Sequence, residues 1–474
     1  MDSATARQTG HQSRTHSRSP TRKSTSFSPN PSLLASLSSP HRSPPPSPAF
    51  SLEAHRAIAR LVTRRSDLAA LCLVSRAFCR VSQAILYNTV HFNDLKGGAL
   101  VCETLVANAG LARRVKAMTI QIWARPRRAE QGTAHANAEE EASEEDSESE
   151  GASDESRGDD RSEAELETPA EFWALVAKTL VKTINLRHLV VDISSPISTA
   201  VEYAWSLGGA ECPFRLHTFH CDFDWDANLV AFLETQTELY DLYVRDYRDL
   251  ALLSSPLSPQ EVSPPIALHN NNSPLPALTT LECTFSEAAV LLSPGRPLSR
   301  LKTAFSTPPH IANREPEIRL LISALRRSNA PLISLDVGDA PLPGATAEAE
   351  TASMQLLQRV AHARAMTMAR ELRYFGTLIL PVGGRKRLQF YGILIRLSAL
   401  RCVELDVTSW KPPPSSSPAL RALAAELRLY CKDITTIVFV HGEDLQRTIV
   451  AVDAVTGVLK VDRSAMPDHL WREI

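Results

Sequence analysis

One short pattern of apolar residues recurs along most of this chain and limits how the chain can fold. The pattern is apolar-x-x-apolar-x-apolar, and its last two apolar residues are separated by one polar residue, as in a half-buried strand. We therefore expect a series of short strands, one for each copy of the pattern. The second apolar residue of each copy stands at Met118, Leu189, Phe219, Leu242, Leu281, Leu335, Leu378, Val403 and Ile437, with a weaker copy at Leu301.

Segments with helical periodicity lie between several of these expected strands. Alternation of strand and helix predicts parallel strands with helices on the outside. A doubly wound α/β domain would show the same alternation and stays an alternative, although the expected strands are short and no Gly-rich phosphate-binding turn follows any of them. The expected helices are Glu171–Lys182, Glu315–Arg327, Lys386–Leu397 and Ala419–Leu429.

Only the spacing between Met118 and Leu189 does not fit this series, because it spans 71 positions. Between them, residues 130–167 hold sixteen acidic side chains and few aliphatic ones. Such a segment buries too little apolar surface to offset the entropy lost on ordering. If residues 126–168 form a disordered acidic insert of 43 residues, the remaining spacing is 28, which lies within the range of the other copies. The insert is therefore expected to interrupt the repeat rather than to separate two domains.

Two further segments have the composition of irregular structure. Residues 1–49 are rich in Ser, Pro and Arg and are expected to be a disordered tail, and residues 254–276 are expected to form a loop. Near the other end, residues 449–452 and 458–461 flank a Val-Thr-Gly turn and predict a hairpin that closes the stack of strands, where Leu470 and Trp471 of a short helix are expected to pack. Residues 93–474 as a whole resemble an irregular leucine-rich repeat, a family whose units usually run 20–29 residues. That resemblance implies an α/β solenoid with parallel strands lining one face and helices on the other.

Residues 50–92 predict a small module of three short helices. Leu52, Ile58, Leu61 and Val62 recur at helical spacing, Ser66-Asp67 is the expected N-cap of a second helix, and Ser75 that of a third. The residues Asp67-Leu68-x-x-Leu71-x-Leu73-Val74-Ser75-Arg76-x-Phe78, followed by Leu86-Tyr87-x-x-Val90, resemble the F-box of fungal F-box proteins. The resemblance implies docking on a Skp-family adaptor, which connects such proteins to a cullin-RING ubiquitin ligase. The residues expected to bind the adaptor are Leu52, Ile58, Leu68, Leu71, Val74 and Phe78.

If the chain is a solenoid, polar residues that alternate with the apolar ones line its open strand face. They form a mixed surface of acidic, basic and aromatic side chains, which suits a protein ligand better than DNA. The residues expected to bind a target protein are Asp192, His220, Asp222, Tyr243, Arg245, Lys302, Asp336, Glu404 and Asp406.

The sequence offers no recognisable catalytic motif. It contains no Gly-x-Ser-x-Gly or His-Glu-x-x-His arrangement, and Gly383-Gly384-Arg385-Lys386-Arg387 lacks the spacing of a phosphate-binding loop. The run from His220 to Asp226 is rich in potential metal ligands, but neighbouring residues of a strand point in opposite directions. We therefore expect no metal, no cofactor and no enzymatic activity.

Charge and hydropathy exclude two classes of partner. The net charge of −2 favours neither nucleic acid nor an anionic membrane, and no apolar run is long enough to span a bilayer. The N-terminal residues lack the apolar core of a secretory signal, so a cytoplasmic or nuclear location is expected. These observations predict a non-catalytic substrate-recognition subunit of a Skp–cullin–F-box-type ligase. A second interpretation, an interaction scaffold without a ligase role, stays open because Ser51-Leu52-Glu53-Ala54 replaces the usual Leu-Pro-x-Glu opening of the family.

Overall fold

Helices and strands alternate along the described residues from Leu52 onward, which form one unit of mixed α/β structure. The expected disordered tail, the acidic insert and all but the last two residues of the expected loop at 254–276 lie outside the described residues. The computed structural model describes residues 51–122, 169–193, 212–223, 225–245, 275–305, 314–338, 347–362, 370–442, 444–463 and 469–474.

Three helices open the unit: α1 (Leu52–Leu61), α2 (Arg65–Val74) and α3 (Arg76–Leu86). Ser75 caps α3 as expected, because its hydroxyl accepts a hydrogen bond from the Phe78 N–H at 3.2 Å. The cap expected at Ser66-Asp67 is wrong. Helix α2 already includes Arg65 and Ser66, and its N-cap residue Arg64 makes no side-chain cap bond.

One sheet of thirteen strands follows, with the strands in the order in which they occur along the chain. Neighbouring strands from β1 to β11 pair in parallel, and the last two pairings are antiparallel. A doubly wound sheet requires a reversal of strand order, so that alternative is excluded. The strands are β1 (Thr89–Phe92), β2 (Ala117–Ile122), β3 (His188–Ile193), β4 (Thr218–Cys221), β5 (Asp241–Val244), β6 (Thr280–Cys283), β7 (Arg300–Ala304), β8 (Ser334–Gly338), β9 (Tyr374–Ile379), β10 (Cys402–Asp406), β11 (Thr436–His441), β12 (Gln446–Val452) and β13 (Leu459–Asp462).

The register of the parallel strands follows the apolar pattern. Met118 is paired with Leu189 although the insert separates them in sequence, as the expected spacing required. The same row of buried side chains continues through Phe219, Leu242, Leu281, Leu301 and Leu335. Leu301, the weaker copy of the pattern, is thus a full member of this buried row. Thr303 stands where the pattern has its third apolar residue; it is buried, and its hydroxyl accepts a hydrogen bond from the Cys283 thiol.

One copy of the pattern was assigned the wrong register. In β9 the residue that pairs with Leu335 and Val403 is Phe375, and the predicted residue Leu378 pairs with Leu405. The register shifts because Gly376 and Thr377 together oppose Glu404, which makes a β-bulge. A bulge adds one residue that the apolar spacing does not reveal.

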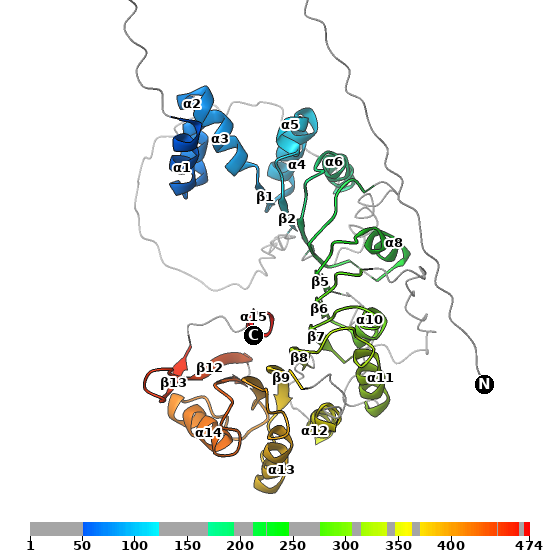
Figure 1. Cartoon of the computed structure of the whole chain (residues 1–474), viewed down its shortest axis with the longest axis vertical. Coiled ribbons are helices and arrows are strands. Elements are labelled where there is room, and N and C mark those ends of the chain that lie inside the picture. Colours follow the sequence, from blue (N-terminus) through cyan, green and yellow to red (C-terminus); the bar gives the residue numbers. More distant parts are fainter. Residues whose placement is uncertain are drawn as a thin grey trace, which may run out of the picture. The chain divides into compact units, whose positions relative to one another are not determined.

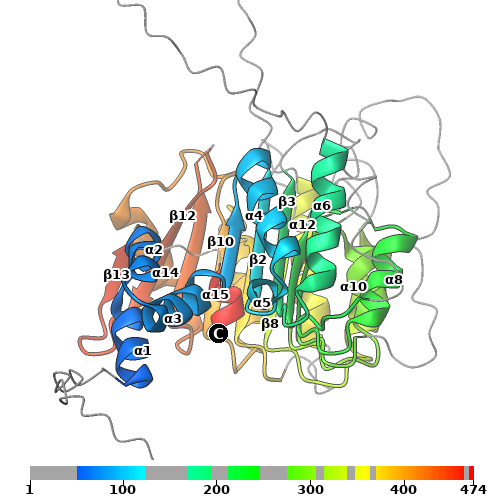
Figure 2. The same ribbon diagram turned by 90° about the horizontal axis from the view of Figure 1, so that it is seen from above.

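Helices cover the outer side of the sheet, and the side opposite to them is called the inner face below (Figure 1). Helix α6 buries Phe172, Trp173, Val176 and Leu180, which share one face at helical spacing. Helix α4 lies beside α6 (Figure 2). The two approach closely at Gly98, where an added Cβ would lie 2.9 Å from the Phe172 ring. The helices are α4 (Leu95–Ala107), α5 (Ala109–Ala112), α6 (Pro169–Lys182), α8 (Ala227–Thr235), α10 (Ser286–Leu292), α11 (Glu315–Leu325), α12 (Ala347–His362), α13 (Gly384–Leu394) and α14 (Ser417–Tyr430).

The hairpin expected near the end of the sequence is present, because β12 and β13 pair antiparallel. One further helix, α15 (Leu470–Glu473), is the only described helix after β13, and it contacts β7, β8 and β9 from the inner face (Figure 1). Across the described ranges, no helix combines the length and the apolar character that a membrane crossing demands.

Candidate recognition surfaces

The inner face presents one continuous row of polar side chains from neighbouring strands. Strands β4 to β9 are in parallel register, so side chains at equivalent positions lie side by side. The next strand adds Glu404, opposite the bulge of β9. We call this set the inner polar row; its members are His220, Tyr243, Glu282, Lys302, Asp336 and Glu404, and the equivalent position of β9 is Gly376, which has no side chain.

Five of the nine residues expected to bind a target belong to this row. The rings of His220 and Tyr243 meet edge to face with centroids 5.7 Å apart, and Lys302, Asp336 and Glu404 follow on later strands. Asp192 lies in β3, and the exposed Arg245 follows the end of β5.

Asp222 and Asp406, like Asp192 and Arg245, lie outside the row, so four of the nine are not members of it. Asp222 is buried just beyond the end of β4, two residues after His220. Asp406 is the last residue of β10, and its Oδ1 accepts hydrogen bonds from the N–H and hydroxyl of Thr408 at 2.8 and 2.7 Å. Asp406 therefore stabilises the end of its strand through local structure.

Two carboxyl groups of the row are buried close together. The hydroxyl of Thr377 lies 2.9 Å from Asp336 Oδ1 and 3.3 Å from Glu404 Oε1, so it bridges the two side chains. Because a hydroxyl has one proton to donate, it can satisfy only one of these carboxylates at a time. Tyr374 donates its hydroxyl proton to Glu404 Oε2 at 2.9 Å, and Arg447 Nε donates to Oε1 at 3.2 Å.

Burial raises the pKa of both carboxyl groups. For Glu404, desolvation and the neighbouring Asp336 raise the pKa to about 7, although Arg447 acts in the opposite direction. Desolvation also raises the pKa of Asp336, against the influence of Lys302. The pair therefore holds a proton near neutral pH, which relieves the repulsion between two adjacent carboxylates.

The bulge in β9 makes this cluster possible. A Cβ at position 376 would lie 2.7 Å from the Tyr374 hydroxyl and 3.0 Å from Asp336 Oδ1, so only glycine leaves room for both groups. Paired carboxyl groups with raised pKa values also occur in enzyme active sites. Here, however, Asp336 and Glu404 are only 3% and 2% exposed, and their oxygens already accept hydrogen bonds from Tyr374, Thr377 and Arg447.

Helix α15 supplies an arginine to the inner face. Arg472 Nη1 donates to both carboxylate oxygens of Asp241, at 2.5 and 2.6 Å, and Nη2 donates to Glu282 at 2.8 Å. All three side chains are largely withdrawn from solvent. Burial acts to raise the pKa of Asp241, but interactions with His220 and Arg472 outweigh it and leave the pKa below its ordinary value. Asp241 is therefore ionised at neutral pH and forms a charge-assisted pair with Arg472.

The neighbouring Trp471 is buried on the same face. It belongs to a hydrophobic cluster with Tyr374, Cys402, Val438 and Ile449. The guanidinium carbon of Arg472 lies 4.6 Å from the centroid of its ring, within the range of a cation–π interaction. Leu470 and Trp471 thus pack against Ile449 and Ala451 of the closing hairpin, as expected, and the same cluster extends onto β9, β10 and β11.

Five residues of the inner face were not expected to belong to a site from the sequence: Glu282, Arg472, Tyr374, Thr377 and Arg447. Glu282 could have been predicted from the sequence to lie on the inner face, because it alternates with the buried Leu281 and Cys283. The contact of Arg472 with Asp241 joins residues 231 positions apart, and no local pattern indicates it.

The helical module exposes part of its apolar surface. Helix α1 buries His55 and Ala59, whereas Leu52 and Ile58 are 41% and 39% exposed. Of the other residues expected to bind an adaptor, Val74 is 66% exposed and Leu68 is buried. Leu71 and Phe78 are half-buried, and Leu71 packs against the core of the module.

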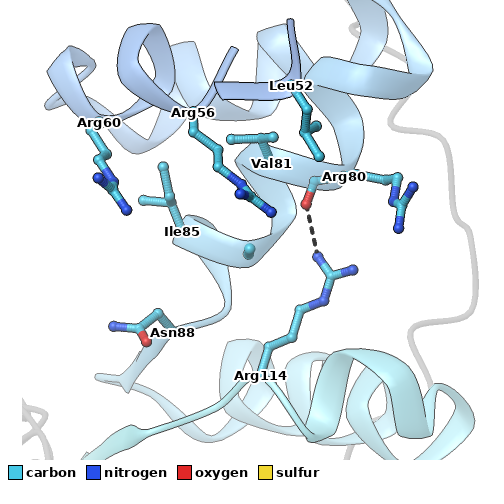
Figure 3. Close-up of a pocket in the computed structure, with 9 residues that line it drawn as sticks. Leu52, Arg56, Arg60, Arg80, Val81, Ile85, Asn88 and Arg114 are labelled. Atoms are coloured by element: carbon cyan, nitrogen blue, oxygen red, sulfur yellow. Dashed lines mark hydrogen bonds between the residues drawn. The ribbon is translucent and has the colours of Figure 1, made fainter. Parts of the chain in front are cut away.

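A basic cavity of about 600 Å³ separates this module from the start of the sheet (Figure 3). Four arginine side chains line it, and Arg114 Nη1 donates to the carbonyl oxygen of Arg80 at 3.1 Å. The lining combines these four cationic side chains with four apolar ones from α1 and α3. It consists of Leu52, Arg56, Arg60, Arg80, Val81, Ala84, Ile85, Asn88 and Arg114.

Within the described ranges, no three His, Cys, Asp or Glu side chains come together in a way that could hold a metal ion. Comparison with known proteins adds no family: no family model matches the sequence, and no curated protein matches it significantly.

Proposed function

We propose that this chain is a non-catalytic substrate-recognition subunit of a Skp–cullin–F-box-type ubiquitin ligase. In this proposal α1 to α3 are an F-box-like module that docks a Skp-family adaptor, and the sheet with its helices is an irregular leucine-rich-repeat-type solenoid. The inner face holds the target protein near the charged ubiquitin carrier. No chemistry is required of the chain itself, because raising the effective concentration of the target is sufficient.

The observation that carries the proposal is the apolar surface that α1 and α2 leave exposed. Leu61, Leu73 and Val74 are 83%, 89% and 66% exposed, while the buried core of the module consists of Ala59, Leu68 and Val81. Large side chains that remain exposed beside so small a core favour burial against a partner. The resemblance of residues 67–90 to the F-box names the adaptor as that partner.

The sequential order of the strands supports the solenoid. Each parallel strand contacts the strands before and after it in the chain, which is how stacked repeats bury a shared core. Irregular spacing does not contradict this, because an insertion between two repeats leaves the pairing of their strands unchanged. The pairing of Met118 with Leu189 across residues 123–168 is an example.

Co-purification with a Skp-family adaptor tests the proposal. Val74→Asp should abolish adaptor binding, because it places a carboxylate in the proposed apolar interface. The exposed position of Val74 predicts that the variant stays folded. Leu71→Asp should also abolish binding, but it disturbs the core of the module as well.

Leu429→Asp is the matched control, because Leu429 is 74% exposed on α14, far along the sequence from the module. It should bind the adaptor normally. If the folded Val74→Asp chain still retains the adaptor, the F-box assignment is wrong. If the natural chain itself binds no adaptor, the alternative of an interaction scaffold without a ligase role is favoured.

A further inference from the structure

Helix α15 lies on the inner face as a bound peptide would. Residues 464–468, which precede it, lie outside the described residues. A helix of four residues has no independent stability, so its position depends on the groups that it contacts. The contacts of its two central residues, Trp471 and Arg472, are with the inner face of the sheet and the adjoining hairpin.

The inner face offers these two residues complementary places. Asp241 and Glu282 from neighbouring strands hold the guanidinium group of Arg472 through three hydrogen bonds. Tyr374, Cys402 and Val438 provide an apolar surface for the indole of Trp471. The face therefore recognises an aromatic ring and a guanidinium group on consecutive residues, which are side chains enriched at binding hot spots.

The fit of α15 is incomplete. The indole N–H of Trp471 is buried without a hydrogen-bond partner, and so is the hydroxyl of Ser334 on β8 beneath this part of the face. Each unsatisfied buried group destabilises the docked arrangement, because its hydrogen bonds to water are lost and not replaced. Of these two groups only the Ser334 hydroxyl belongs to the face, so a ligand that hydrogen-bonded to it and buried no unpaired N–H of its own would bind better than α15 does.

From this arrangement we infer that residues 469–474 are a tethered peptide ligand, and that the inner face binds a protein segment in which an aromatic residue is followed by arginine. Such a segment competes with α15 for Asp241 and Glu282. The inference rests on the proposed use of the inner face for target recognition, but it does not depend on the adaptor.

The test uses the full chain with α15 weakened and a synthetic peptide of residues 464–474 carrying a fluorophore. Trp471→Ala/Arg472→Ala should vacate the face, and Arg472→Glu should do so while keeping the indole. Both variants should retain the circular dichroism of the natural chain. Fluorescence anisotropy should then show peptide binding at least ~10-fold tighter than to the natural chain, whose face is already occupied.

Matched variants assign the binding to the proposed contacts. In the vacated chain, Asp241→Asn/Glu282→Gln should lose the peptide, whereas Glu238→Gln, at an exposed acid, should not. Peptide binding should weaken as salt is added, because the contact is partly ionic. If both vacated chains unfold, α15 is a permanent part of the core and the inference is wrong. Folded vacated chains that bind no peptide would overturn it equally. Neither result depends on the adaptor, so each can be told apart from a failure of the ligase proposal.

Discussion

The helical module and the sheet that follows it differ in how completely they bury their own apolar residues. Ala59, Leu68 and Val81 are the buried core of the module. In the sheet, one continuous hydrophobic cluster extends from Val90 to Val450. Each strand extends a hydrophobic core that its neighbours already share. The three helices of the module form a separate and much smaller core. Incomplete burial thus distinguishes the module, whose exposed apolar side chains are the basis of the proposed docking on an adaptor, from the sheet.

The largest effect on stability is expected from a carboxylate placed in a hydrophobic core, and it distinguishes the sheet from the helical module. Leu301→Asp puts a carboxylate into the continuous core and should unfold the whole sheet, because desolvating it costs several kcal/mol, which is a large part of the stability of a domain. Leu68→Asp should melt only the module. Thermal unfolding followed by circular dichroism, together with limited proteolysis at residues 52–88, distinguishes the outcomes. If Leu68→Asp also removes the main transition, the two regions form a single cooperative unit.

The second prediction concerns the polar part of the sheet. Burial raises the pKa of Glu404 from its ordinary 4.5 to about 7, so the folded chain holds this proton more tightly than the unfolded chain does. Its contribution to stability is therefore largest below pH 4.5 and decreases as the pH rises through 7, by on the order of 3 kcal/mol. Glu404→Gln should remove most of this decrease. Asp433→Asn, at an exposed acid, is the control and should leave the pH dependence of thermal unfolding as it is.

The register of the sheet could be predicted from sequence because each strand buries every second residue. The pairing of Met118 with Leu189 follows from this periodicity alone. At β9 the same reasoning failed, since the bulge at Gly376 adds a residue without changing the apolar composition. Strand β1 was not predicted either, because its four residues follow the third helix directly and contain no full copy of the pattern.

The sites were less predictable than the fold. Helical spacing identified Leu52 and Ile58 as one face of α1, but the face that packs inside the module is that of His55 and Ala59. Hydrophobicity alone does not distinguish a face that meets the core from one that meets a partner. On the inner face, the polar row follows from strand alternation, whereas Arg472 reaches it through a contact that only the folded chain creates.

The third prediction tests whether the inner face is used for recognition. Tyr243→Ala/Arg245→Ala should keep both the fold and the adaptor but lose target binding by ~2 kcal/mol or more, about thirtyfold in affinity. Tyr243 is half-buried against His220, and Arg245 is exposed at the strand end. Circular dichroism comes first, and quantitative co-purification of bound proteins follows. An unchanged set of bound proteins would place recognition elsewhere.

The smallest effect on thermal stability is expected from deletion of the acidic insert, although this is the largest change in sequence. Deleting residues 126–168 and joining the ends by a short flexible linker should leave the thermal midpoint within a few degrees. Strands β2 and β3 are already paired in register, with Ile122 opposite Ile193, so the deletion removes none of the hydrogen bonds between them. The entropy of closing a loop varies slowly with its length, and a shorter loop costs slightly less. As a control, a chain with the segment replaced by a Gly/Ser linker of 43 residues should unfold at nearly the same temperature. A fall of ten degrees or more in both chains would show that the acidic segment contributes contacts of its own, and that the sheet depends on more than its shared core.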